Sequence, residues 1–150
     1  MRIFPILLSV SMLTACNSVY MHPNSMERES VVYSTKGGYT LRPVVKEIMA
    51  QRGYTVKIGK IKNTNQIAET MGQEFEAIEI PSDAKYIVRV AESSEKFRPI
   101  WCALNGFWWW RFNMSIVDNE SDQEILTWSG RGCASSTARL FERILNELEK

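Results

Sequence analysis

Cys16 is the residue of this chain best placed for covalent modification, because it ends a segment with the pattern of an export signal. A short basic region containing Arg2 is followed by an apolar run from Ile3 to about Leu13, and then by small residues. A buried N-terminal helix or a membrane span is the alternative interpretation. The apolar run is much shorter than the roughly 20 residues that cross a bilayer, so the pattern favours a signal for export.

The residues Leu13-Thr14-Ala15-Cys16 resemble the lipobox of bacterial lipoproteins. In that family, signal peptidase II cleaves before a cysteine that already carries a diacylglyceryl group. The resemblance implies that residues 1–15 are a signal peptide and that Cys16 becomes a lipid anchor carrying fatty acids such as palmitate. Asn17 stands where an inner-membrane retention signal would place Asp. The expected location is therefore the periplasmic face of the outer membrane, with the inner membrane as the alternative.

The charge balance of the mature chain argues against a polyanionic partner. Removal of residues 1–15 takes away Arg2, which leaves 17 basic residues against 17 acidic ones. A nucleic-acid-binding protein is expected to carry a basic patch or stripe, whereas the basic residues here are scattered among acids. The remaining length suits one domain with one hydrophobic core, which we expect over residues 30–150.

Cys102 and Cys133 remain as thiols once Cys16 is lipidated. The periplasm is oxidising, and a pair of cysteines there usually becomes a disulfide. If a hairpin turns between Asp118 and Gln123, both cysteines lie just beyond the open end of its two strands. We therefore expect a structural disulfide. Free thiols are the alternative, and two thiols without further ligands are too few for a zinc site.

Residues 16–29 combine the lipidated cysteine with a polar segment that lacks apolar periodicity. We expect this segment to be a flexible tether between the membrane and the domain. His22, the only histidine, falls within it. A catalytic histidine needs a fixed setting and an orienting partner, so a solvated linker residue is the favoured interpretation of His22.

The first half of residues 30–150 predicts strands and helices in alternation. A short strand is expected at 30–34, and the apolar spacing from Leu41 to Met49 predicts a helix that Gly53 ends. A second strand is expected at 54–58, and a short helix within 63–75 with Ile67, Met71 and Phe75 facing inward.

The second half predicts a hairpin and a closing helix. Residues 86–90 are typical of a strand, and 92–96 of a charged turn. Alternation over 107–117 puts Trp108, Trp110 and Phe112 on one apolar face, and the chain is expected to return over 124–130 before an amphipathic helix. The fold class predicted is α+β: an antiparallel or mixed sheet of about five strands with two amphipathic helices packed on one face.

A second resemblance covers most of residues 30–150. Gln51-Arg52-Gly53-Tyr54, the passage from Ser82 to Val88, and the hairpin from Ile116 to Gly130 are similar to small bacterial outer-membrane lipoproteins that carry domains of unknown function. The resemblance implies a fold class and little about function. This chain departs from the pattern at Lys85, where an acid is usual.

The sequence predicts no catalytic residue, no metal site and no cofactor. A serine or cysteine nucleophile requires a base, and the only histidine lies in the expected tether. The nucleophile-elbow and zinc-protease motifs are missing. The acids Glu74, Glu76 and Glu79 suit a solvated face better than paired-carboxylate hydrolysis.

Binding is the function class that the sequence favours. Residues 97–107 form an apolar, aromatic loop next to the expected disulfide. The candidate contact residues are Phe97, Arg98, Trp101, Phe107 and Trp109. Trp, Phe and Arg commonly anchor interfaces, and an exposed patch of them would contact a partner or the membrane surface. The alternative is that the loop packs on the core.

These observations lead to a hypothesis of a lipid-anchored, non-enzymatic periplasmic domain that binds another envelope component, with an envelope protein as the expected partner. It would serve secretion, conjugation, outer-membrane assembly or envelope maintenance. A small-ligand or glycan binder that uses the Trp-rich loop is the alternative. A hydrolase or a hydrolase inhibitor is a third class.

Overall fold

The structure, a computed structural model, describes residues 17–35, 41–60, 67–70, 73–76, 78–97, 99–104 and 109–149. A six-stranded mixed sheet has the order β1-β8-β7-β6-β2-β3. Its strands are β1 (Asn17–Met21), β2 (Val31–Ser34), β3 (Thr55–Ile58), β6 (Tyr86–Ser94), β7 (Trp109–Asp118) and β8 (Glu124–Cys133). The strand β2 runs parallel to β3 and β6, and the other pairs are antiparallel. The predicted α+β class is confirmed, with one more strand than expected.

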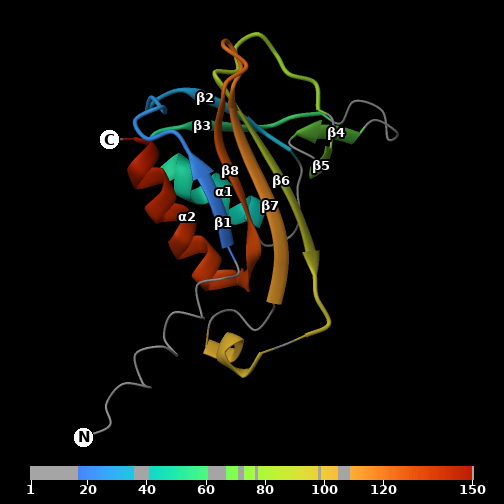
Figure 1. Cartoon of the computed structure of the whole chain (residues 1–150). Helices are drawn as coiled ribbons and strands as arrows, with labels where there is room; N and C mark the ends of the chain where they lie inside the picture. The colour runs from blue at the N-terminus through green and yellow to red at the C-terminus, as the bar shows by residue number, and fades with distance from the viewer. Residues whose placement is uncertain are drawn as a thin grey trace, which may run out of the picture.

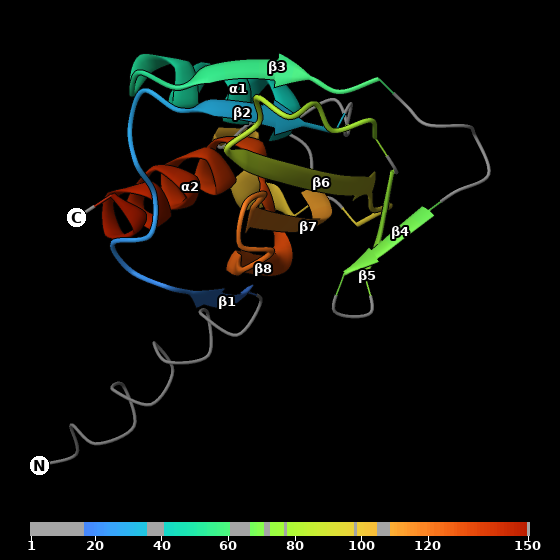
Figure 2. The same cartoon turned by 90° about the horizontal axis from the view of Figure 1, so that it is seen from above.

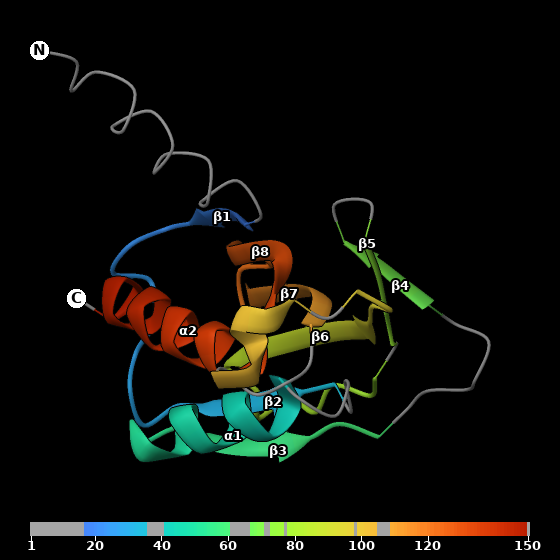
Figure 3. The same ribbon diagram turned by 90° about the horizontal axis from the view of Figure 1, so that it is seen from below.

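Two helices, α1 (Leu41–Gln51) and α2 (Ala134–Leu148), bury their apolar stripes against one face of this sheet. Figures 1 and 3 show both helices on the same side of the strands. The expected spacing is confirmed at buried residues of both helices, among them Leu41, Val45, Phe141 and Leu145. Gly53 ends α1 at φ 95°, a conformation that glycine adopts without a steric penalty from Cβ.

An aromatic stack lies at the centre of the core between the hairpin β7–β8 and α2. The ring of Trp128 lies edge-on to Phe112 at 4.5 Å and stacks on Phe141 at 6.3 Å. All three side chains are buried. The even positions of β7 face this core as the alternation predicts at Phe112, Met114 and Ile116, whereas Trp108 lies outside the described residues.

The other face of the sheet is partly covered as well. A smaller cluster of buried residues joins Tyr33, Ile87, Ile78 and Ala84. Ser115 on β7 is buried too, although the alternation predicts a polar, open face there. The chain that leads into β6 therefore covers one end of this face, and Figure 2 shows the small hairpin of β4 and β5 beside β6.

The helix predicted within 63–75 is wrong. The structure forms two short antiparallel strands instead, β4 (Ile67–Thr70) and β5 (Gln73–Glu76). Residues spaced by four, such as Ile67, Met71 and Phe75, fit the alternation of strands as well as a helical turn. The sequence also contains Gly72 within this range, and glycine is unfavourable in a helix interior.

The flexible tether predicted for residues 16–29 is also wrong over residues 17–29; Cys16 itself lies outside the described residues. The strand β1 pairs with β8 along its whole length, from Asn17 opposite Gly130 to Met21 opposite Leu126. Beyond it, the backbone N–H of Met26 donates to Leu148 O at 3.0 Å, and the Met26 side chain is buried. An exposed edge strand carries little apolar periodicity, so its sequence looks like a polar linker.

The charged turn predicted for 92–96 is only partly correct, since β6 continues to Ser94. Glu92 lies within this strand, and its Oε2 accepts a hydrogen bond of 2.8 Å from the backbone N–H of Leu41. A carboxylate at this position satisfies one of the free N–H groups at the start of α1 and suits the helix dipole.

Candidate functional site

Three aromatic side chains from separate parts of the chain meet at one end of the sheet. Phe97 follows β6, Trp101 lies in the short 3-10 helix η2 (Ile100–Leu104), and Trp109 begins β7. Their ring centroids are 6.3 to 6.5 Å apart and all three pairs are edge-to-face. This geometry is favourable for aromatic pairs, so the three rings support one another.

Two aliphatic residues extend this cluster outward. Ile100 and Leu104 of η2 are 90% and 93% exposed, and Phe97 and Trp101 remain 61% and 57% exposed. Large apolar side chains so open to solvent are unusual when they are contiguous. We call Phe97, Ile100, Trp101, Leu104 and Trp109 the aromatic patch.

The disulfide fixes the patch to the sheet. Cys102 of η2 is bonded to Cys133, the last residue of β8, with their Cα atoms 5.4 Å apart, which confirms the predicted pairing. Both cysteines are buried. Within η2 the backbone N–H of Cys102 donates to Pro99 O at 2.9 Å. Cys102 therefore points inward, and the residues on either side of it are turned toward solvent.

Polar groups hold Trp109 at the base of the patch. Its Nε1–H donates to Glu95 Oε2 at 2.9 Å, and the other oxygen of Glu95 lies 2.8 Å from Nε of Arg131. Trp109 is only half-buried. The indole therefore has a fixed orientation and one satisfied donor, with part of its ring still available for contact.

Three of the five candidate contact residues named from the sequence lie side by side. The structure brings Phe97, Trp101 and Trp109 together, whereas Arg98 and Phe107 lie outside the described residues. Ile100 and Leu104 were missed as individual contact residues, because aliphatic side chains in a loop usually fold onto the core. The sequence did contain one signal for them. Ile100 and Leu104 each lie two residues from Cys102, and a buried Cys102 leaves these flanking positions free to face solvent.

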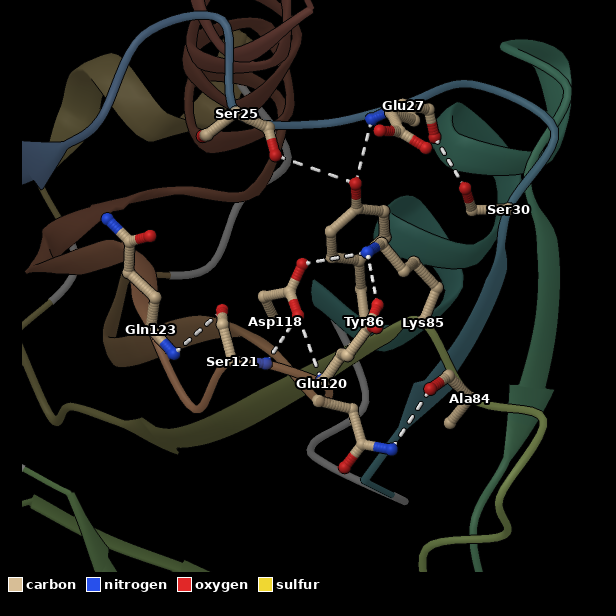
Figure 4. A network of polar contacts seen from close by, with 11 residues as sticks. Ser25, Glu27, Ser30, Ala84, Lys85, Tyr86, Asp118, Glu120, Ser121 and Gln123 are labelled. Atoms are coloured by element: carbon tan, nitrogen blue, oxygen red, sulfur yellow. Dashed lines mark hydrogen bonds and ion pairs between the residues drawn. The ribbon is translucent and has the colours of Figure 1, made fainter.

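The turn between β7 and β8 carries a second polar cluster at the opposite end of the sheet (Figure 4). Asp118 accepts hydrogen bonds from the backbone N–H groups of Glu120 and Ser121, and Lys85 Nζ lies 3.3 Å from Asp118 and 3.2 Å from Glu120. These contacts are within and beside a tight turn. The cluster stabilises the hairpin and ties it to Lys85, the residue before β6. It contains no nucleophile paired with a base.

The hydroxyl of Tyr86 joins the N-terminal segment to this end of the sheet. It accepts a hydrogen bond of 2.8 Å from the backbone N–H of Glu27 (Figure 4). Burial is the largest cause of a raised pKa at Tyr86. The phenol therefore stays neutral, as a structural hydrogen-bonding group does.

A third candidate is an open groove beside the two helices, lined by Arg28, Ile48, Gln51, Arg52, Glu142 and Asn146. Next to it the buried carboxylate of Glu149 lies 2.8 Å from Arg52 and 3.1 Å from Arg28. Burial, followed by the charge of Glu149, raises the pKa of Tyr54. Arg52 also donates to Asn146, so this cluster connects the end of α1 to the end of α2.

His22 lies in the ordered segment after β1 and not in a free linker. Its backbone N–H donates to Ile125 O at 2.9 Å, and its Nε2 lies 3.1 Å from the hydroxyl of Tyr20. Within the described ranges no group of three or more His, Cys, Asp and Glu residues is arranged to hold a metal ion. Among the same residues, no helix is long and apolar enough to span a bilayer.

Comparison with known proteins finds no matching family model and no matching curated protein. Solved structures give distant similarities. PelC, a dodecamer from Paraburkholderia phytofirmans, is 12% identical over 89% of this chain and 97% of its own, with a TM-score of 0.47. TolB from Acinetobacter baumannii is 10% identical over 88% of this chain and 31% of its own, with a TM-score of 0.46. These similarities are too distant to assign a function.

Proposed function

We propose that this chain is a lipid-anchored, non-enzymatic binding domain of the bacterial envelope, and that the aromatic patch contacts another envelope component. The observation that carries the proposal is the exposure of Ile100, Trp101 and Leu104 on a segment that a disulfide fixes in place. Pre-ordering lowers the entropy lost on binding, because the contact residues already hold their positions.

The composition of the patch suits contact better than chemistry. Tryptophan and phenylalanine supply large apolar area with few rotatable bonds, and such residues dominate the energetics of interfaces. The charged groups beside them, Glu95 and Arg131, are paired with each other. A contact of this kind would serve secretion, conjugation, outer-membrane assembly or envelope maintenance.

Anchoring is tested by Cys16→Ser. The thioether to diacylglycerol requires the sulfur, so this variant should incorporate no labelled fatty acid. It should also keep residues 1–15, because cleavage follows attachment of the diacylglyceryl group. Wild-type protein should incorporate the label, lose residues 1–15 and fractionate with the outer membrane. Fatty-acid labelling of Cys16→Ser at the wild-type level would contradict the lipobox interpretation.

Contact through the patch is tested by mild cross-linking of the anchored protein in cells. Leu104→Glu should remove the adduct formed by the wild type, because burying a carboxylate in an apolar contact is costly. The matched control is Ile80→Glu, at an exposed apolar residue in the segment between β5 and β6. Equal adducts in both variants would place the contact surface elsewhere. A tryptophan fluorescence change with saccharide, without an adduct, would favour the glycan-binding alternative.

A further inference from the structure

The aromatic patch and the start of the described chain lie at the same end of the sheet. Asn17 is paired with Gly130 on β8, and Cys133, which holds η2, is three residues further along the same strand. A strand rises about 3.3 Å per residue, so Asn17 and Cys133 are about 10 Å apart along β8. Figure 1 shows the beginning of β1, the end of β8 and η2 together at the lower end of the molecule.

This register places the expected lipid anchor close to the same end of the sheet. Cys16 precedes Asn17, and neighbouring Cα atoms are about 3.8 Å apart. All five residues of β1 are paired with β8, from Asn17 to Met21. Residues 17–21 therefore provide no slack between a lipid on Cys16 and the sheet.

We propose that the component contacted by the aromatic patch is the lipid surface of the membrane that holds Cys16. This inference rests on the proposed function, since it needs the anchor at Cys16. The diacylglyceryl group holds the end of the sheet at the bilayer, and the patch lies within about 10 Å of it along β8. A protein partner at the same surface would have to enter between the patch and the bilayer.

The side chains of the patch match the boundary between headgroups and acyl chains. Ile100 and Leu104 are the most exposed side chains of the patch and would enter the acyl region. Tryptophan prefers the headgroup level, where its ring is buried and its N–H remains near polar groups. Trp101 lies between the two aliphatic residues in η2, and Trp109 lies behind it with its N–H already bonded to Glu95. The patch thus has an apolar tip and a more polar base.

The charges around the patch favour an anionic lipid surface. Within the described residues 95–97, 99–104, 109–111 and 131–133, three basic residues, Lys96, Arg111 and Arg131, stand against one acid, Glu95. Arg111 and Arg131 are cross-strand partners with exposed side chains. Basic residues near a membrane surface are attracted to the negative headgroups of anionic lipids.

Two contacts with one bilayer would also fix the orientation of the domain. The diacylglyceryl group on Cys16 would hold the chain at the bilayer but leave the domain free to rotate about that attachment, whereas a second apolar contact would restrict the rotation. With η2 on the lipid, the turn between β7 and β8 at the opposite end of the sheet points away from the membrane. Its polar cluster of Lys85, Asp118 and Glu120 would then face the aqueous compartment.

The test uses full-length lipidated protein purified from membranes and reconstituted into vesicles of phosphatidylethanolamine and phosphatidylglycerol. Part of the lipid carries bromine on its acyl chains, which quenches tryptophan fluorescence at close range. Wild-type protein should lose emission in brominated vesicles relative to unbrominated ones. Trp101→Phe should lose most of this quenching, which assigns it to the patch.

A double substitution, Ile100→Glu with Leu104→Glu, should abolish the quenching while the mass of the lipid on Cys16 stays unchanged. The control Ile80→Glu should keep the wild-type quenching. Absence of quenching in lipidated wild-type protein would overturn membrane docking and leave the lipid anchor intact. If quenching is absent while the cross-linking experiment in cells gives a protein adduct that Leu104→Glu removes, the patch binds a protein, and the proposed contact function stands without membrane docking.

Discussion

Trp109 and Cys133 are directly opposite each other on the antiparallel ladder of β7 and β8. Cys133 is bonded to Cys102, whose neighbour Trp101 meets Trp109 with ring centroids 6.3 Å apart. The disulfide and the aromatic contact therefore join η2 to the two members of one cross-strand pair. Covalent and non-covalent contacts together fix the aromatic patch in one position.

Loss of the disulfide should destabilise the domain and loosen the patch. The bond joins cysteines 31 residues apart, and a loop of this length corresponds to about 3 to 4 kcal/mol of stabilisation. Urea unfolding of the double variant Cys102→Ser, Cys133→Ser should show this decrease. In native protein, both thiols should resist alkylation until a reductant is added. Immediate labelling of both would contradict the bridge.

The core and the patch should respond differently to truncation. Trp128→Ala removes a buried ring that contacts Phe112 and Phe141, and should cost about 3 to 5 kcal/mol. Leu104→Ala should change the free energy of unfolding by less than about 0.5 kcal/mol, because Leu104 is almost fully exposed. Thermal melting of the two variants provides the comparison. A large loss for Leu104→Ala would mean that η2 packs on a core.

The sequence predicted the elements in which apolar residues recur with a clear helical or strand period. The stripes of α1 and α2 and the alternation at Phe112, Met114 and Ile116 are confirmed, because one face of each element is deeply buried. It failed at β1, whose exposed residues show no such period, and at β4–β5, where a spacing of four fits either structure. The long-range pairing of β1 with β8 decided the first segment, and a local hairpin between β4 and β5 decided the second.

The same limit applies to the candidate site. Residue types alone identified Phe97, Trp101 and Trp109, since aromatic side chains beside a cysteine pair are informative. Their position next to the expected anchor could not be predicted, because it depends on the register of Asn17 with Gly130. That pairing joins segments more than a hundred residues apart, and no local pattern specifies it.

Acid should weaken the turn between β7 and β8 through Asp118. Burial alone would raise its pKa, but hydrogen bonds from Ser121 and Glu120 and contact with Lys85 lower the pKa below its usual value. A lowered folded-state pKa stabilises the fold above the unfolded value of about 4, and this stabilisation is lost as pH falls through the folded value. Asp118→Ala should cost about 1 to 2 kcal/mol at neutral pH and less in acid. Urea unfolding at both pH values measures this, and a cost independent of pH would contradict it.

The two arginines on Glu149 should contribute unequally to stability. Arg52 is mostly buried and lies 2.8 Å from Glu149 Oε2, whereas Arg28 binds the same oxygen from a solvent-exposed position. Arg52→Ala should cost about 2 to 3 kcal/mol because it leaves a buried carboxylate poorly compensated. Arg28→Ala should cost less than about 1 kcal/mol. Equal losses of unfolding free energy for the two variants in chemical denaturation would contradict a specific role of Arg52 in joining the ends of α1 and α2.

The most direct test of the central claim is photo-crosslinking from the patch in living cells. A photoreactive phenylalanine analogue replaces Leu104 in the lipidated protein, and a matched variant carries it in place of Ile80. Mass analysis after irradiation should show adducts with an envelope component at position 104, at a yield well above that at position 80. Equal yields at the two positions, or no adduct at position 104, would contradict the assignment of the aromatic patch as the contact surface.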